Sequence, residues 1–330
     1  GAFGGVGEAL CLWLVLSCGA KHLVLLTSRN IPVEGEDPRL PLIEMLESAG
    51  ANISVLHCDC SNATEITDVM NQVAIDCKQT QRRFSGIFHL AGVHKDLSIE
   101  NLTEEESNYV MAAKINGALA LHNATKKLSI ELQFMCFFSS MFSLFGFPNL
   151  AAYAAANGFL NGLADVRNAQ GLRTLSIQLG TIAGPGMAGR LGTEWEAHWQ
   201  NLGMDFLKIP KVLNHLGRFL NDCNQAFDNA AVFSCDWNEF QTTRFVTPLF
   251  DNLVSRPLPL RVQPPTRESE FEKLKNKEHE AKIQQLSMES VVVQCIRAEI
   301  LNAINMLVGE CYTDSPETRH LEFVILGESV

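Results

Sequence analysis

The chain has 330 residues, enough for one large domain or for a large and a small one, and its apolar fraction is ordinary for a globular protein. The formal net charge of -11 disfavours nucleic acid or an anionic membrane as the main partner, because phosphate binding needs clustered lysine and arginine. The 10 cysteines lack CxxC pairing, and no apolar run approaches the roughly 20 residues of a membrane helix. We therefore expect a cytoplasmic protein with reduced thiols, no membrane contact and no metal site.

Segments typical of strands alternate with segments typical of helices. A glycine-rich start leads into an apolar helix, and polar or glycine-containing turns separate the later segments. Strands are predicted at 21–29, 51–60, 84–93, 132–140, 173–180 and 230–237. Helices are predicted at 61–79 with a Ser61 cap, at about 108–127, and at 151–170 with Gly171 as the stop. This alternation predicts an α/β fold, a Rossmann-type, doubly wound parallel sheet with helices on both faces.

Both ends of the sequence are abrupt. The chain starts within the glycine-rich turn GAFGGVG, although a dinucleotide fold places a strand ahead of such a turn, and it stops after the apolar run LEFVILGESV. We therefore expect a fragment of a longer polypeptide whose first strand is missing. We also expect a folded domain at 1–250, a linker rich in Pro, Lys and Glu at 251–285, and a short helical C-terminal tail at 286–330.

The glycines of the opening turn are candidate cofactor-binding residues. Without a Cβ they let the backbone approach a pyrophosphate at the N-terminus of a helix. These residues are Gly1, Gly4, Gly5 and Gly7. A tight turn or a loose chain end would also explain the cluster, so the interpretation depends on the residues around it.

The ends of three predicted strands supply further candidates for the cofactor site. One strand ends in Thr27, Ser28 and Arg29, where an NAD-selective site carries an Asp or Glu. A hydroxyl and a guanidinium there favour the 2′-phosphate of NADP(H), although Arg29 is also consistent with a solvated loop residue. The candidates at the other two strand ends are Asp59 and Cys60, and Ala91 and Gly92. Asp59 has the alternative role of capping the next helix.

Four polar residues at the same expected sheet edge supply the chemistry of carbonyl reduction. Hydride transfer to a carbonyl requires a proton donor, hydrogen bonds that hold the oxygen, and a cation that lowers the pKa of the donor. Tyr153, in the first turn of a helix, is the candidate donor, and Asn157 lies one turn later, where it can hold a water or the lysine. Ser140 ends the preceding strand, and Lys114 comes from the helix before that strand.

Each of these four residues alone has an ordinary structural explanation. Ser140 would satisfy a turn amide and Lys114 would be solvated. Asn157 would lie on a helix surface and Tyr153 would belong to the core. All four residues are expected at the edge of the sheet where a nicotinamide ring would lie. A single reductase site explains this better than four unrelated structural roles.

Residues 1 to about 250 resemble the ketoreductase domain of polyketide synthases, a branch of the short-chain dehydrogenase/reductase superfamily. The resemblance is carried by GAFGGVG, LLTSR, HLAGV, KINGALALH, FFSSMFSLFGFPNLAAYAAAN and LGTIAGPGMA. The superfamily usually has Tyr-x-x-x-Lys, whereas this branch looks like the present chain, with asparagine at that place and the lysine upstream. The resemblance implies the roles of acid for Tyr153, oxyanion partner for Ser140, pKa-lowering cation for Lys114 and orienting residue for Asn157.

The resemblance also implies a reaction, in which NADPH reduces an acyl-carrier-bound β-ketoacyl thioester to the β-hydroxyacyl product beside other synthase domains. Family members that give the D-configured alcohol usually carry Leu-Asp-Asp where this chain has His94, Lys95 and Asp96. Phe145 replaces the Trp that marks the opposite class, and Pro148 fits the first class. The resemblance therefore favours the D product.

The segment 286–330 resembles the opening of an acyl carrier domain, whose Gly-x-Asp-Ser-Leu motif carries phosphopantetheine on serine. The matching stretch runs from Gly327 to Val330 and is one residue short, which makes Ser329 the candidate attachment site and chance similarity the alternative. Two other functions stay open. One is a free-standing short-chain reductase of small ketones, against which the carrier-like tail argues, and the other is a catalytically inactive synthase fragment.

Overall fold

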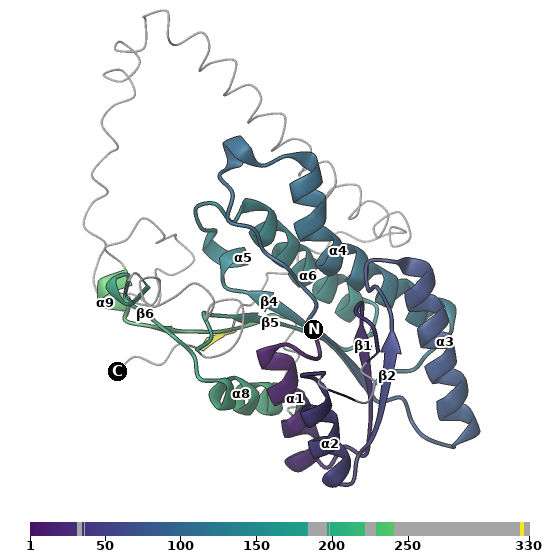
Figure 1. Cartoon of the computed structure of the whole chain (residues 1–330). Coiled ribbons are helices and arrows are strands. Elements are labelled where there is room, and N and C mark those ends of the chain that lie inside the picture. The colour runs from purple at the N-terminus through teal and green to yellow at the C-terminus, as the bar shows by residue number, and fades with distance from the viewer. Residues whose placement is uncertain are drawn as a thin grey trace, which may run out of the picture.

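The computed structural model describes residues 1–31, 35, 37–183, 197, 199–221, 229–240 and 324–326. They form an α/β fold in which helices pack on both faces of parallel strands, as the sequence predicts (Figure 1). None of the helices in these ranges is long and apolar enough to cross a membrane.

The main sheet has five strands in the order β3-β4-β5-β7-β9, and every neighbouring pair is parallel. Its strands are β3 (Gly86–His89), β4 (Phe134–Ser140), β5 (Thr174–Leu179), β7 (Asn229–Val232) and β9 (Val324–Leu326). A separate parallel pair consists of β1 (His22–Thr27) and β2 (Asn52–His57). A short antiparallel pair consists of β6 (Met204–Asp205) and β8 (Ser234–Cys235).

The glycine-rich turn lies between the two parallel sheets. Within the described ranges no strand is hydrogen-bonded between β1 and β3. Gly1 lies against the end of β3, because a Cβ built on Gly1 would stand 2.6 Å from the carbonyl carbon of Leu90. The turn therefore enters the fold at the carboxyl edge of the strands.

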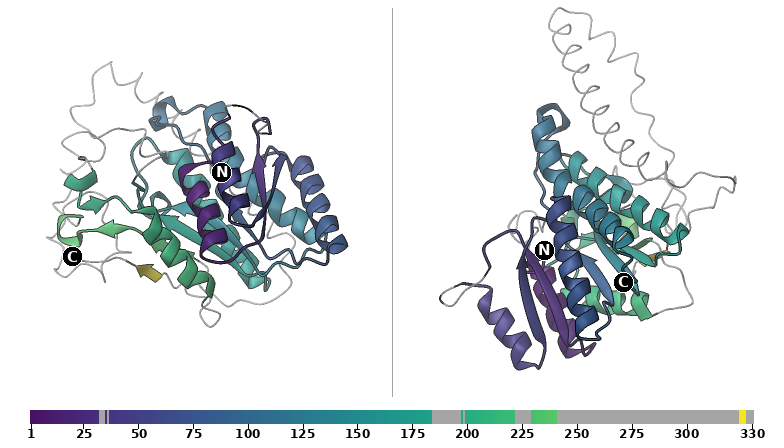
Figure 2. Two further views of the ribbon diagram at one scale, coloured as in Figure 1. Left: turned by 60° about the horizontal axis from the view of Figure 1, so that its bottom comes forward. Right: turned by 90° about the vertical axis from the view of Figure 1, so that its right-hand side faces the viewer.

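The helices form two layers around the main sheet (Figure 2). One layer contains α3 (Ala63–Gln79), α4 (Glu104–Lys127) and α6 (Ala151–Ala169), and the other contains α1 (Gly5–Leu16) and α8 (Ile209–Asn221). The remaining helical segments are α2 (Leu40–Ser48), α5 (Phe142–Phe145), α9 (Trp237–Phe240) and a short 3₁₀ turn at Ile99–Asn101.

Two caps explain where helices begin, and each differs from its predicted start. The side chain of Asn62 accepts hydrogen bonds from the N–H groups of Thr64 and Glu65, so Asn62 rather than Ser61 caps α3. Helix α4 begins at Glu104, earlier than predicted, because Thr103 caps it and three glutamates stabilise its first turn.

The apolar side chains of β4 alternate between the two helix layers. Met135 and Phe137 pack with α3, α4 and α6, whereas Cys136 and Phe138 pack with α1 and α8. Burial of each large apolar side chain contributes roughly 1.5–3 kcal/mol. This packing fixes the register of β4 and therefore the position of Ser140 at its end.

Most of the predicted C-terminal segments lie outside the described residues. These include the linker at 251–285 and most of the tail at 286–330, with Ser329. The described part of the tail, Val324–Leu326, forms a strand beside β7 rather than a helix. Three consecutive apolar residues suit a strand as well as a segment of a helix, and periodicity alone does not separate the two.

Candidate active site

The turn from β4 into α6 brings Ser140 and Tyr153 together. Ser140 is the last residue of β4, and Tyr153 lies in the first turn of α6. The Ser140 hydroxyl lies close enough to the Tyr153 phenol for a side-chain hydrogen bond to lower the pKa of that phenol. The Ser140 hydroxyl also accepts a hydrogen bond from the N–H of Phe142 at 3.3 Å. A phenol and an aliphatic hydroxyl therefore meet at the carboxyl edge of the main sheet, where α/β proteins bind ligands.

Lys114 is a buried cation beside this pair. Its side chain comes from the middle of α4, is 3 % exposed, and donates a hydrogen bond from Nζ to the carbonyl oxygen of Phe138 at 2.8 Å. The Nζ atom lies 5.8 Å from the centroid of the Tyr153 ring. Burial lowers the pKa of Lys114 from 10.5 to about 8, so the group is still mostly charged at neutral pH.

Opposing influences set the pKa of the Tyr153 phenol. Burial raises it above its usual value and outweighs the hydrogen bonds from Asn157 and Ser140, which lower it. The positive charge of Lys114 nearby also favours the ionised phenol. The arrangement suits a phenol that has to give up a proton to a substrate.

The contacts of Asn157 are with its own helix and with the end of β4. The side chain is fully buried, and its Nδ2 donates to the backbone carbonyl of Tyr153 at 2.7 Å instead of contacting Lys114. Its backbone carbonyl accepts a hydrogen bond from the Ser139 hydroxyl at 3.1 Å. Its Oδ1 is buried without a partner among the described residues. Asn157 thus fixes the first turns of α6 against β4.

Two residues close the space around the lysine and the phenol. A Cβ on Gly92 would stand 2.8 Å from Cε of Lys114, so the absence of a side chain at position 92 makes room for the lysine. The ring of His94 packs edge-on against the ring of Tyr153, with centroids 6.1 Å apart. His94 therefore forms one wall of the site, next to the Tyr153 phenol.

The glycine turn offers backbone donors at the start of α1. Gly4 caps this helix without a side-chain hydrogen bond, so the first N–H groups of α1 lack the partner that a capping side chain would supply. A Cβ on Gly7 would stand 2.2 Å from the carbonyl oxygen of Gly1, whereas one on Gly4 would approach the same oxygen only to 3.4 Å. Gly7 is thus needed for the tight turn itself, and the open helix end near Gly4 fits a pyrophosphate.

The polar groups at the strand ends predicted to bind cofactor differ in whether they already make hydrogen bonds within the protein. Thr27 is buried and its hydroxyl accepts from the N–H of Arg29 at 3.1 Å. Asp59 accepts from the Ser61 N–H and hydroxyl, which makes it part of a local turn. The thiol of Cys60 points to the carbonyl of Ala113 at 3.7 Å. These contacts leave Ser28 and the Arg29 side chain as the free polar groups of the predicted set.

A single cleft of about 1510 Å³ joins these parts. Every predicted site residue within the described ranges lines it, except Asn157, which lies behind Tyr153. Residues that line the cleft and that the sequence prediction did not place in the site include Phe3, Arg39, His89 and His94. Two sequence signals point to His94, namely its place in the loop after a predicted strand and its match to the first position of the Leu-Asp-Asp stretch of the family.

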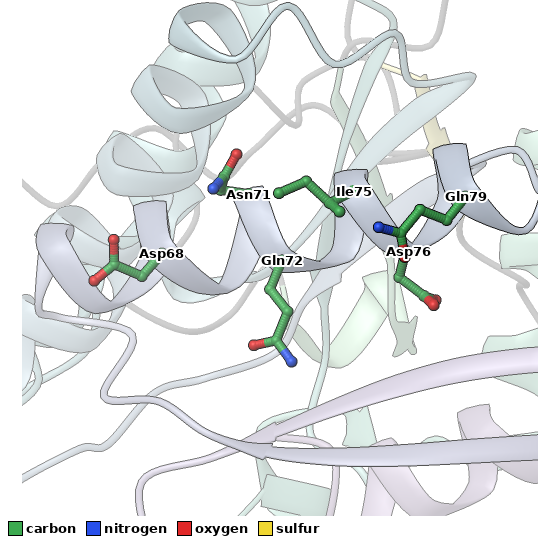
Figure 3. A pocket seen from close by; sticks show the side chains of 6 residues that line it. All are labelled: Asp68, Asn71, Gln72, Ile75, Asp76 and Gln79. Atoms are coloured by element: carbon green, nitrogen blue, oxygen red, sulfur yellow. The ribbon is translucent and has the colours of Figure 1, made fainter.

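A second, shallow hollow of about 390 Å³ lies on the outer face of α3 (Figure 3). Its lining consists of exposed side chains of one helix, namely Asp68, Asn71, Gln72, Ile75, Asp76 and Gln79. It contains no nucleophile and no polar group converging from a second element, so we assign no site to it.

Comparison with known families agrees with this arrangement. A family model described as KR domain matches residues 1–184, which is more than half of the chain. The chain belongs to the KR family, the ketoreductase domains of polyketide synthases. It is therefore an oxidoreductase domain. The match ends before residues 286–330, so it lends no support to the expected carrier segment.

The relatives of this ketoreductase domain are large synthases. It is 34% identical over 195 residues to erythronolide synthase EryA3 of Saccharopolyspora erythraea, a match that covers 59% of the chain and 6% of the relative. It is 32% identical over 196 residues to 6-methylsalicylic acid synthase of Penicillium terrestre, covering 57% of the chain and 11% of the relative. The chain thus spans a small part of the length of these relatives.

Solved ketoreductases share the fold. The ketoreductase from the first module of phoslactomycin biosynthesis in Streptomyces sp. HK803 is 26% identical, with a TM-score of 0.64 over 78% of this chain and 55% of the other. An A1-type ketoreductase is 28% identical, with a TM-score of 0.63 over 78% of this chain and 50% of the other.

Proposed function

We propose that this ketoreductase domain uses NADPH to reduce a β-ketoacyl thioester, carried by an acyl carrier domain of a polyketide synthase, to the β-hydroxyacyl thioester. The observation that carries the proposal is the contact of Ser140 with Tyr153 beside the buried cation of Lys114, in the cleft that begins at the glycine turn. The D configuration of the product and phosphopantetheine on Ser329 are part of the same proposal and rest on the resemblance alone.

The cofactor, when bound, supplies the hydride that adds to the carbonyl carbon. Gly4 and Gly5 at the start of α1 would hold the pyrophosphate with backbone N–H groups, and the end of β1 would hold the ribose phosphate. Gly92, without a side chain, would leave room for the nicotinamide end. The residues of the glycine turn and of the strand ends thus fit a dinucleotide at the carboxyl edge of the strands.

The residues of the chain perform the proton chemistry. The hydroxyl groups of Ser140 and Tyr153 donate hydrogen bonds to the carbonyl oxygen of the substrate, which holds it and polarises it. As negative charge develops on that oxygen, Tyr153 passes it a proton. Lys114 stabilises the phenolate that results, and Asn157 keeps the first turn of α6 in place.

A substitution of the phenol tests the proposal. Tyr153→Phe removes the proton but leaves the ring, and we expect kcat for NADPH oxidation with a β-ketoacyl thioester surrogate to fall by about 10²–10⁴-fold. Tyr109→Phe is the matched control, because Tyr109 is 55 % exposed and its ring contacts Lys95 rather than Lys114. Turnover by wild type only with small free ketones would favour a free-standing reductase. No turnover by wild type with either substrate would favour an inactive fragment.

A further inference from the structure

Arg39 reaches from the start of α2 back to the end of β1. Its Nη1 donates to the hydroxyl of Thr27 at 3.4 Å, and its Nη2 donates to the carbonyl oxygen of Asn30 at 2.6 Å. The side chain is only 13% exposed. An arginine that precedes one helix is therefore held at the strand end where a dinucleotide fold places the adenosine ribose.

Asp37 holds this guanidinium in one orientation. Nε and Nη2 of Arg39 donate to the two carboxylate oxygens of Asp37 at 2.9 and 2.6 Å, a two-point contact. The same contact lowers the pKa of Asp37 to about 2, so the carboxylate is charged throughout the neutral range. The fixed geometry reduces the conformational entropy that Arg39 would lose when it binds an anion.

Phe3 connects the guanidinium to the glycine turn. The Cζ atom of Arg39 lies 5.5 Å from the centroid of the Phe3 ring, within the range of a cation–π contact. A single cation thus bridges the glycine turn and the end of β1. Both segments flank the 2′ position of an adenosine bound in this kind of fold.

Arg29 is held less firmly. Its backbone N–H donates to Thr27, but its side chain is exposed and makes no hydrogen bond or ion pair with a described residue. An exposed arginine loses more side-chain entropy on binding than one already fixed.

We propose that Arg39 provides the larger share of the binding energy for the 2′-phosphate of NADPH, with Asp37 and Phe3 as its positioning partners. This inference rests on the proposed function and names the residue that decides cofactor choice within it. The 2′-phosphate is a dianion, and the Nη1 edge of Arg39, which has only the long contact to Thr27, is the edge that can donate to it. NADH lacks that phosphate and gains nothing from Arg39.

Binding of adenosine nucleotides, measured by calorimetry, tests the proposal without turnover. We expect Arg39→Ala to weaken the binding of adenosine 2′,5′-bisphosphate by about 10- to 100-fold, while the affinity for 5′-AMP stays within about 2-fold of the wild-type value. Arg29→Ala should produce a smaller loss, and Arg218→Ala on the exposed face of α8 should produce none. Arg39→Lys should recover part of the loss, because it restores the charge without the two-point geometry.

The outcomes separate this inference from the function on which it rests. An Arg39→Ala variant that keeps the full preference for the bisphosphate, or loses less of it than Arg29→Ala, overturns the role of Arg39. A wild-type protein that prefers the bisphosphate but lacks reductase activity would leave Arg39 supported and count against the proposed function. A wild-type protein that binds neither nucleotide contradicts both.

Discussion

Replacement of Lys114 by methionine should separate catalysis from stability. Methionine has a similar length and is apolar, so it fills the buried site without the charge. At neutral pH the buried ammonium of Lys114 lowers the stability of the folded wild-type protein, because its pKa is lowered from 10.5 to about 8. That difference corresponds to about 3 kcal/mol of unfavourable free energy at 1.36 kcal/mol per pKa unit.

The sign of the stability effect follows from proton binding. Between about pH 8 and 10.5 the unfolded chain binds more protons at Lys114 than the folded chain does, so the stability of the wild type should rise with pH in this window. The methionine variant lacks that rise. The carbonyl of Phe138 loses its donor, which costs about 1–3 kcal/mol. Near neutral pH the variant should thus lie within about 2 kcal/mol of the wild type.

The effect on catalysis should be much larger. A unit charge 5.8 Å from the Tyr153 ring centroid, at an effective dielectric constant of about 20, contributes about 3 kcal/mol to the ionised phenol. Loss of this charge leaves the ionised phenol less stable, which raises the pKa of Tyr153 further. We expect kcat to fall by about 100-fold, within the range of general acid catalysis.

Steady-state kinetics with NADPH and a β-ketoacyl thioester, combined with denaturant unfolding, measure both effects. Lys127→Met, in the exposed last turn of the same helix, controls for loss of a lysine. A kcat within 3-fold of wild type in a folded Lys114→Met protein would refute the role given to the cation. A loss of activity that is matched by loss of folded protein would show that packing explains it instead.

Two further results are expected. As pH rises through about 8, Lys114 loses its charge and kcat should fall. In Lys114→Arg the falling limb of the profile of kcat against pH should move to higher pH. An unchanged limb would show that another group causes the fall in kcat. Gly7→Ala should abolish the binding of NADPH measured by calorimetry, because the new Cβ would stand 2.2 Å from the Gly1 carbonyl oxygen. Gly4→Ala, whose Cβ would stand 3.4 Å from the same atom, should leave the turn intact and weaken NADPH binding less. Equal losses of affinity in the two variants would contradict the steric explanation.

The sequence predicts the elements well because their patterns are local. The alternation of strands and helices from 21 to 180 and the first turn of α6 around Tyr153 follow from apolar periodicity and glycine punctuation. The prediction that Ser140 and Lys114 lie at the same edge of the sheet follows from the topology of parallel strands.

The finer contacts depend on tertiary geometry that periodicity does not encode. The amide nitrogen of Asn157 donates to a carbonyl of its own helix, and Lys114 donates to the carbonyl oxygen of Phe138. The sequence did not predict the position of Arg39, because its contact with Thr27 forms only when the segment that starts at Asp37 folds back on β1. The cap of α3 shifted to Asn62 because Asp59 already engages Ser61.

Deuterium transfer tests the central claim most directly. The protein would be given NADPH labelled with deuterium at the transferable position of nicotinamide C4, together with a β-ketoacyl thioester, and the product would be analysed by mass spectrometry. The account predicts one deuterium at the β-carbon of the hydroxyacyl thioester with wild type and almost none with Tyr153→Phe. Oxidation of the cofactor without label in the thioester, or equal labelling by the Tyr153→Phe variant, would contradict it.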